Sequence, residues 1–510
     1  MGLSLFLSLT LSLSSTHTHT HTHTHRWQTN GTTGAIEPTP PFFIENVFEE
    51  LDYPNEFFFN VTEKRLYVVW NSSSTAPPEN LKFVVPQLRR LISAVGDNST
   101  FPIRNVTIRG LRFRDASTTY MAEWGVPSGG DWALHRGGAV FLENTKNITI
   151  ENNLFRRVDG NAIFVSGYNR DVSIYMNEFN FIGDTAVGLW GYTDEFDGRN
   201  GEQPRGTQIV GNVCHEIGSY QLQSACVFQA KSARTTISRN VFFNGPRSGI
   251  NFNDGFGGGN RVENNVIFNQ CRQSGDHGPI NSWDRQLYFT DLRSPSGSWS
   301  PIMSNVSRNV IIANYGGSQG FDNDDGTFVC VCVWGGVTRA IMILLTNNLF
   351  CTGSSWYNIS RNVIFGEGFK MDYGGHDSVY VNNLNIVKKY DGQNCLNTGN
   401  FKRGNPPCAN DALRNGTCSH SSRFENNHCI VLYTDVYAQN MGACPPDLDS
   451  MPILRNNSYY TPNQGNATSE QCKMTVYELQ KHGIEIGSTS KTIPSDSEWK
   501  QWAIDLLGWL

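Results

Sequence analysis

The most regular feature of the chain is a short phrase of alternating apolar and polar residues that recurs through its middle. Its copies are ITIENNLF ending at Phe155, VSIYMNEF at Phe179, TTISRNVFF at Phe243, RVENNVIF at Phe268, NVSRNVII at Ile312 and YNISRNVIF at Phe365. Alternation with a period of two is typical of a strand that buries one face. Each copy is too short for a helix, so the phrase predicts short strands separated by turns.

The spacing of the phrase predicts how these strands stack. The asparagine before the last apolar pair falls at Asn153, Asn177, Asn212, Asn240, Asn265, Asn309, Asn362 and Asn383. Several steps are only 21 to 28 residues long, which is too short for a propeller blade. Leucine-rich repeats would need LxxLxL with helices, and neither is present. We therefore predict an all-β chain that forms a right-handed parallel β-helix (a solenoid), with three strands in each coil and each strand stacked on its copy.

The repeated asparagine has two expected roles in such a solenoid. Its short amide side chain tolerates the left-handed conformation at a sharp corner. Stacked asparagine side chains can also hydrogen-bond to one another along the stack. The Phe and Ile residues of the phrase are expected to fill the interior.

One step of the repeat is 53 residues long, from Asn309 to Asn362. It contains the apolar segment TFVCVCVWGGVTRAIMILLTNNLFCTG, at positions 327–353. Without these 27 residues the step would be 26 residues, which is one ordinary coil. VCVCVW also resembles a translated GT repeat, so we hypothesise a retained intron, with a genuine apolar loop as the alternative. A peptide from this segment in the mature protein would refute the intron.

The flanks of the repeat divide the rest of the chain. Residues 1–37 are of low complexity (LSLS and THTHTH runs), and are either a signal segment or a mispredicted exon. Residues 38–100 are an entry module or early coils, and 101–387 are the β-helix. Residues 388–475 are an irregular, disulfide-prone region or late coils. Residues 476–510 are expected to form a helical cap, whose last helix begins near Ser495.

Composition narrows the classes of function. The 510 residues carry 40 Lys and Arg against 46 Asp and Glu, a net charge of −6, which argues against nucleic-acid binding. No apolar run of about 18 residues appears, so no membrane span is expected. We expect a monomer whose partner is a polysaccharide or glycan.

Cysteines and sequons favour the secretory route. Six of the 12 cysteines lie in one C-terminal stretch without CxxC pairs: Cys395, Cys408, Cys418, Cys429, Cys444 and Cys472. This pattern indicates disulfides rather than zinc. Frequent N-x-Ser/Thr sequons, such as those at Asn60 and Asn147, are consistent with a secreted glycoprotein.

Four polar clusters interrupt the repeat and are the candidate sites. They are WGVPSGGDWALHR ending at Arg136, NFNDGFGGG ending at Gly259, SGDHGPINSWDR ending at Arg285, and GFDNDDG ending at Gly326, which KMDYGGHD follows after the long segment. Stacked coils could gather their carboxylates on one side of the solenoid. Two carboxylates with a Trp platform are what glycoside cleavage requires, one as acid and one as nucleophile or base.

Other interpretations of these clusters remain open. An Asp followed by Gly is common in turns. Asp322 to Asp325 could instead bind Ca²⁺ through oxygen ligands, which with Lys370 or Arg285 as base would suit a polysaccharide lyase. Otherwise no cofactor or metal is expected. A non-catalytic carbohydrate-binding or cell-surface β-helix protein is the rival from a different class.

The phrases PSGGDWALHRGGAV, GPRSGINFNDGFGGGN, SGDHGPINSWDRQ, GFDNDDG and GFKMDYGGHDS resemble those of the β-helix glycoside hydrolases of family 141. That family includes an α-L-fucosidase and a xylanase, so the resemblance implies hydrolysis of a fucosidic or xylosidic bond in a cell-wall polysaccharide. It implies Asp284 and Asp325 as the catalytic carboxylates, with Asp276 and Asp324 as close rivals. The candidate substrate-binding residues are Asp254, His277, Trp283, Arg285, Asp131, His135, Lys370, Asp372 and His376.

Overall fold

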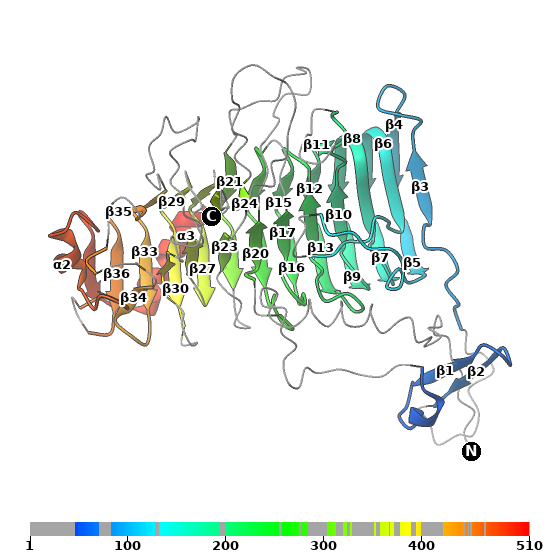
Figure 1. The fold of residues 1–510 in the computed structure, drawn as a ribbon, viewed down its shortest axis with the longest axis horizontal. Helices are drawn as coiled ribbons and strands as arrows, with labels where there is room; N and C mark the ends of the chain where they lie inside the picture. The colour runs from blue at the N-terminus through cyan, green and yellow to red at the C-terminus, as the bar shows by residue number, and fades with distance from the viewer. Residues whose placement is uncertain are drawn as a thin grey trace, which may run out of the picture.

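The computed structural model describes a chain that is mostly β-structure, as predicted, with parallel sheets (Figure 1). The described residues are 46–70, 83–127, 132–193, 200–253, 258–274, 277–283, 303–312, 320–323, 327–328, 351–352, 357–366, 368–371, 378–388, 394–398, 422–439, 441, 444–446, 448, 451–463 and 466–508, with backbone alone at 283, 323, 327–328, 351–352 and 370–371.

The strands form three ladders, and successive strands along the chain belong to each ladder in turn. Ladder one consists of β3 (Ile92–Val95), β6 (Val140–Glu151), β8 (Ile163–Tyr175), β10 (Val187–Trp190), β14 (Val227–Ala230), β17 (Ile250–Asn253), β20 (Ile280–Trp283), β23 (Phe321–Asn323), β28 (Phe369–Met371), β31 (Leu396–Asn397), β34 (Val436–Gln439) and β37 (Thr468–Ser469). Each of these strands pairs in parallel with the next one named.

Ladder two shares the long strands β6 and β8 and continues through shorter strands. Its members are β4 (Ile103–Arg109), the later halves of β6 and β8, β12 (Gln208–Val210), β15 (Thr236–Ser238), β18 (Arg261–Glu263), β21 (Ser304–Ser307), β26 (Tyr357–Ser360), β29 (Val379–Val381), β32 (Arg423–Glu425) and β35 (Ile453–Arg455). The short strand β11 (Pro204–Arg205) also pairs with β8.

Ladder three is a separate sheet of 12 strands. Its members are β5 (Arg112–Ala116), β7 (Leu154–Val158), β9 (Glu178–Ile182), β13 (Val213–Ile217), β16 (Val241–Phe243), β19 (Val266–Phe268), β22 (Val310–Ile312), β27 (Val363–Gly366), β30 (Leu384–Val387), β33 (His428–Val431), β36 (Ser458–Thr461) and β38 (Thr489–Thr492). One apolar core runs between the ladders, from Ile108 to Ile484.

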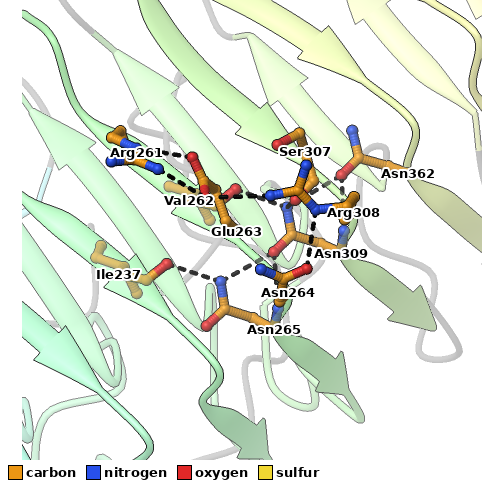
Figure 2. A network of polar contacts seen from close by, with 10 residues as sticks. All are labelled: Ile237, Arg261, Val262, Glu263, Asn264, Asn265, Ser307, Arg308, Asn309 and Asn362. Atoms are coloured by element: carbon orange, nitrogen blue, oxygen red, sulfur yellow. Dashed lines mark hydrogen bonds and ion pairs between the residues drawn. The ribbon is translucent and has the colours of Figure 1, made fainter. Parts of the chain in front are cut away.

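The repeated asparagines form a continuous ladder of their own, as predicted. Asn265 Nδ2 donates to Asn309 Oδ1 at 2.9 Å, and Asn309 Nδ2 donates to Asn362 Oδ1 at 3.0 Å (Figure 2). The same Nδ2 also reaches a backbone carbonyl one coil back, as Asn265 does to Ile237. Each amide is buried and satisfied on both sides, which fixes the register of successive coils.

The structure corrects one detail of this corner. The left-handed residue is the one before the repeated asparagine, for example Asn264 (φ 58°), Arg308 (φ 54°) and Arg361 (φ 56°). The repeated asparagine itself acts through hydrogen bonds and not through its backbone conformation. The residue before the repeated asparagine points outward, so this position can be Arg as well as Asn.

The long step of the repeat is spanned without a break in the ladders. β21 pairs with β26, and β22 pairs with β27, across the 53 residues between Asn309 and Asn362. Within this step β24 (Thr327–Phe328) and β25 (Cys351–Thr352) pair in antiparallel fashion. The two ends of the apolar segment therefore lie together, although most of it falls outside the described residues.

The C-terminal helices do not all cover the end of the stack. α2 (Val476–Gln480) places Val476 and Leu479 in the interior core. α3 (Asp496–Leu507), which has Ser495 as its N-cap, packs instead on the outer face of ladder three, where Trp499 and Trp502 meet Val363, Ile386 and Ile430. The expectation of a terminal cap is thus wrong for α3, because this outer face is apolar there and needs a cover.

The remaining described elements are peripheral. η1 (Phe48–Glu50) packs on a hairpin of β1 (Phe57–Asn60) and β2 (Arg65–Val68), within the predicted entry module. Disulfides join Cys214 to Cys226, Cys395 to Cys429 and Cys444 to Cys472. Cys408 and Cys418 lie outside the described residues. No helix in the described part of the chain is long and apolar enough to cross a membrane.

Candidate functional site

The carboxyl ends of four neighbouring strands in ladder one carry the strongest functional pattern. β17, β20, β23 and β28 stack in parallel, with Ile250 against Ile280, Ile280 against Phe321, and Phe321 against Phe369. In the sequence, the residue that follows each strand directly is aspartate: Asp254, Asp284, Asp324 and Asp372. Parallel strands end at one edge of their sheet, with neighbours about 4.8 Å apart. We call this edge the carboxyl edge of ladder one.

Most of the predicted site residues lie outside the described residues. These are Asp131, Asp254, Asp276, Asp284, Arg285, Asp324, Asp325, Asp372 and His376. Trp283 and Lys370 are described by their backbone alone, at the end of β20 and within β28. His277 and His135 are fully described.

A row of buried polar residues lies on the outward face of the same strands. Ile250 and Phe252 point into the core, so Asn251 and Asn253 between and after them point outward. Asn281 Nδ2 donates to Asn251 Oδ1 at 2.8 Å, and Asn251 Nδ2 donates to Asn253 Oδ1 at 2.8 Å. All three have no exposed surface, so this face is covered where it approaches the carboxyl edge.

The same row continues with charged residues. Asn281 aligns with Asp322 on β23, and Asp322 aligns with Lys370 on β28. Asp322 is fully buried. The sequence analysis includes Asp322 in a polar cluster and in the alternative calcium site, and it names its neighbours Asp324 and Asp325 as the catalytic candidates. The alternation of the strand shows that Asp322 faces outward, which adds a carboxylate to this side.

The segment between β5 and β6 folds over the outward face of ladder one. Trp132 and Leu134 pack there against Phe164, Phe228 and Ala230. An antiparallel bridge between Gly125 and Leu134 closes the segment, and Gln223 Oε1 accepts a hydrogen bond from the Ala133 amide at 3.0 Å. The described part of the first polar cluster is therefore a cover on ladder one, beside the carboxyl edge.

His277 supports this cover. Its Nδ1 accepts a hydrogen bond from Arg247 Nη2 at 2.8 Å. The imidazole packs edge-on against Trp132, and the Arg247 guanidinium lies 4.4 Å from the centre of a Trp132 ring. His277 has no exposed surface, and its contact with Trp132 helps to hold that side chain in place.

His135 lies at the other end of the same cover. Its Nδ1 is 2.7 Å from the Glu123 carbonyl oxygen and therefore donates to it. Burial lowers the pKa of His135, and the positive charges of Arg89 and Arg90 act in the same direction. The ring is neutral at pH 7, with Nε2 as an acceptor.

The structure also reveals a cluster that sequence reasoning missed. Arg136 lies 4.0 Å from the centre of a Trp190 ring and 4.1 Å from the Tyr192 ring. Its Nη1 donates to Ser166 Oγ at 2.9 Å and to the Trp190 carbonyl at 2.8 Å. Tyr192 Oη lies 3.2 Å from Glu143 Oε2. The LWGY phrase at the end of β10 is the signal in the sequence, but it contains no acid.

A second pair of carboxylates lies at the opposite edge of ladder one. Asp184 precedes β10 and is 1% exposed, with Oδ2 accepting from Thr119 Oγ1 at 2.7 Å. Burial raises the pKa of Asp184 to about 7, and the charge of Asp159 adds to this. Burial likewise raises the pKa of Asp159 to about 6. The full length of β10 separates this pair from the carboxyl edge.

Metal ligands do not gather in the described part of the chain. No three His, Cys, Asp or Glu side chains come together there as a metal site. Of the alternative calcium cluster, Asp322 and the backbone of Asn323 are described, and Asp324 and Asp325 are not.

Comparison with known proteins gives distant likenesses. No protein-family model and no curated protein sequence matches the chain. One similar solved structure is described as a glycoside hydrolase, with 16% identity and a TM-score of 0.48 over 66% of this chain and 57% of that one. Another is described as the complex structure of XylC with xylose, with 10% identity and a TM-score of 0.35 over 81% and 62%. The chain thus spans less than two thirds of either.

Proposed function

We propose that this protein is a secreted glycoside hydrolase whose substrate, a polysaccharide, lies along the carboxyl edge of ladder one. The observation that carries the proposal is that four successive stacked strands of this ladder each lead directly into an aspartate. Residues at the ends of neighbouring parallel strands lie within about 5 Å to 10 Å of one another. Glycoside cleavage needs two carboxyl groups at such separations.

We assign the two catalytic roles to Asp284 and Asp325, with Asp324 and Asp276 as alternatives. Ser282 aligns with Asn323, so two residues further along, the same alignment would bring position 284 opposite position 325. One carboxyl group would protonate the glycosidic oxygen, and the other would attack the anomeric carbon or activate water. Two such groups in adjacent coils repel each other when both are ionised, which raises one pKa and supplies the acid.

The family 141 resemblance agrees with this placement. Four of the phrases that carry it, around INFND, INSWD, FDND and FKMD, each contain one of the stacked strands and the aspartate that follows it. We propose that the three ladders are the right-handed parallel β-helix of that family. We also propose that the bond is fucosidic or xylosidic, and that the protein acts as a monomer.

The proposed location rests on the disulfides and the sequons. Three disulfides are typical of a protein that folds in an oxidising compartment. Several sequon asparagines, such as Asn98 and Asn147, lie on the described surface. An extracellular glycoprotein that meets cell-wall polysaccharide is the proposal that fits both.

The test is substitution of the two carboxylates. Asp284→Asn and Asp325→Asn should each lower the release of reducing ends from a fucosylated or xylan-type polysaccharide by about 100-fold or more. The control is Asp505→Asn, on the exposed surface of α3, which should keep full activity. Binding of the polysaccharide should survive in all three variants.

Other outcomes would favour the rival functions. Turnover that disappears with a calcium chelator and yields unsaturated sugars would identify a lyase. Binding without turnover in the unmodified protein would identify a non-catalytic binding protein. Full hydrolysis by both Asp284→Asn and Asp325→Asn would refute the assignment of these residues.

A further inference from the structure

Tyr192 is an exposed aromatic residue whose ring is nevertheless held rigidly. The residue is 40% exposed. Its hydroxyl lies 3.2 Å from Glu143 Oε2 and 3.4 Å from Ser166 Oγ, and its ring is 4.1 Å from the Arg136 guanidinium carbon. An exposed tyrosine normally changes rotamer freely, so ties at both the ring face and the hydroxyl indicate a preorganised surface.

The ring lies beside a row of aligned strand positions that leads to Trp283, the residue before Asp284 in the sequence. A Cβ on Gly167 would come within 2.8 Å of the Tyr192 ring, so the ring covers Gly167, whose φ of +59° also favours glycine. Gly167 follows Ser166, which aligns with Trp190, Ala230, Asn253 and Trp283 in successive strands. In each strand, the residue after the aligned one occupies the next position toward the carboxyl edge. In the sequence, the residue after Trp283 is Asp284.

This alignment fixes the separation. From the strand of Gly167 to the strand of Trp283, which precedes Asp284 in the sequence, there are four strand-to-strand steps, or roughly 19 Å at about 4.8 Å a step. That length exceeds a single sugar ring several-fold. A ligand that touches both Tyr192 and the carboxylates must therefore be a chain that runs along the stack.

The chemistry around Tyr192 suits a neutral sugar. An aromatic face packs against the C–H groups of a pyranose, and the partly exposed Glu143 carboxylate can accept hydrogen bonds from its hydroxyl groups. Arg136 and Glu143 are linked through Ser166 and Tyr192, so the cluster holds one positive and one negative charge. Such a balanced cluster makes no demand for a charged ligand.

We propose that Tyr192, with Glu143 beside it, is a distal subsite for a neutral sugar unit of a chain that is cleaved several units away. This inference rests on the proposed glycosidase and deepens it: the substrate is bound as a chain, and cleavage is internal rather than restricted to a terminal sugar. Arg136 acts as a positioning residue, because it fixes the ring and is covered by it.

The experiment is a chain-length series. The ratio of kcat/KM for the hexasaccharide to that for the disaccharide is measured with xylo-oligosaccharides and with a fucosylated series. Removing one aromatic contact costs about tenfold in transition-state binding, so Tyr192→Ala should lower this ratio about tenfold and leave the disaccharide value unchanged. Tyr192→Phe keeps the ring and should retain most of the ratio. Tyr175→Ala, at a tyrosine of similar exposure (44%) that ends β8 in ladder two, should change nothing.

The outcomes separate the subsite from the proposed activity. If Tyr192→Ala leaves the ratio unchanged, or lowers both values equally, the subsite is refuted while the hydrolase stands. If the unmodified protein cleaves no member of either series, the proposed function fails. The subsite is then judged by calorimetric binding, where affinity should rise with chain length in the unmodified protein and not in Tyr192→Ala. Affinity independent of length, or no binding at all, would overturn it.

Discussion

Asp184 should make the stability of this protein fall as the pH rises toward neutrality. The side chain is 1% exposed, and among the described residues its Oδ1 has no hydrogen-bond partner. Burial raises the pKa of this carboxyl from 3.8 to about 7. The folded protein therefore holds a proton that the unfolded chain releases, so the free energy of unfolding decreases from about pH 4 to about pH 7 and then levels off.

The size of the effect follows from the shift. About three pH units at ~1.4 kcal/mol each give an upper bound of about 4 kcal/mol for the cost of ionising Asp184 in the folded state. Asn has the same shape and no charge, and its Oδ1 can still accept the hydrogen bond from Thr119. The advantage of Asp184→Asn over the unmodified protein should therefore be negligible near pH 4 and should grow by about 2 to 3 kcal/mol between pH 5 and pH 8.

The assay is urea unfolding, followed by far-UV circular dichroism at several pH values between about 5 and 8. Asp505→Asn is the control, since Asp505 is exposed on α3, and its curve should run parallel to that of the unmodified protein. Because the pKa of Asp159 is also raised, to about 6, the free energy of unfolding of Asp184→Asn should still decrease as the pH rises, but by less than in the unmodified protein. Parallel curves for Asp184→Asn and the unmodified protein over this range would refute the reasoning.

Three further predictions concern the ladders and the reaction. Asn265→Ala removes four hydrogen bonds from buried groups of the asparagine ladder, so the free energy of unfolding in urea should fall by about 3 kcal/mol or more. The control Asn358→Ala loses one half-buried hydrogen bond and should lower it by about 1 kcal/mol or less. Equal losses of stability would contradict the ladder's role. Replacing residues 329–350 by a short glycine turn should leave the urea midpoint unchanged, because the flanking residues are already paired; an unfolded product would show that the segment is integral. If Asp284 and Asp325 are the catalytic pair on adjacent strands about 5 Å apart, as proposed, the anomeric configuration should be retained, and an initially inverted product by proton NMR would exclude that spacing.

Much of the architecture follows from local signals in the sequence. The alternation in phrases such as RVENNVIF locates short strands, because period-two burial is read from neighbouring residues. The asparagine ladder was equally accessible, since Asn265 and Asn309 stand at the same place in their phrases. Ser495 and Glu498 likewise mark the start of α3, where they form a capping box.

Other features depend on residues that meet only after the coils have stacked. Arg136, Ser166 and Tyr192 come from three different segments, and no single phrase carries their cluster. The position of α3 was missed for a related reason: a helix with an apolar stripe fits either the end of the stack or its side, and only the outer apolar face of ladder three decides between them. The burial of His277 against Arg247 and Trp132 likewise joins three segments that are distant in the sequence.

The continuity of the asparagine ladder across very unequal coils has a consequence for how such a molecule can diversify. Asn383 meets Asn362 after 21 residues, and Asn362 meets Asn309 after 53, with closely similar amide-to-amide bonds. The pitch of the scaffold is thus independent of what is spliced between its turns. New loops can be grafted beside the carboxyl edge and tuned to a different glycan, while the neighbouring turns keep their spacing.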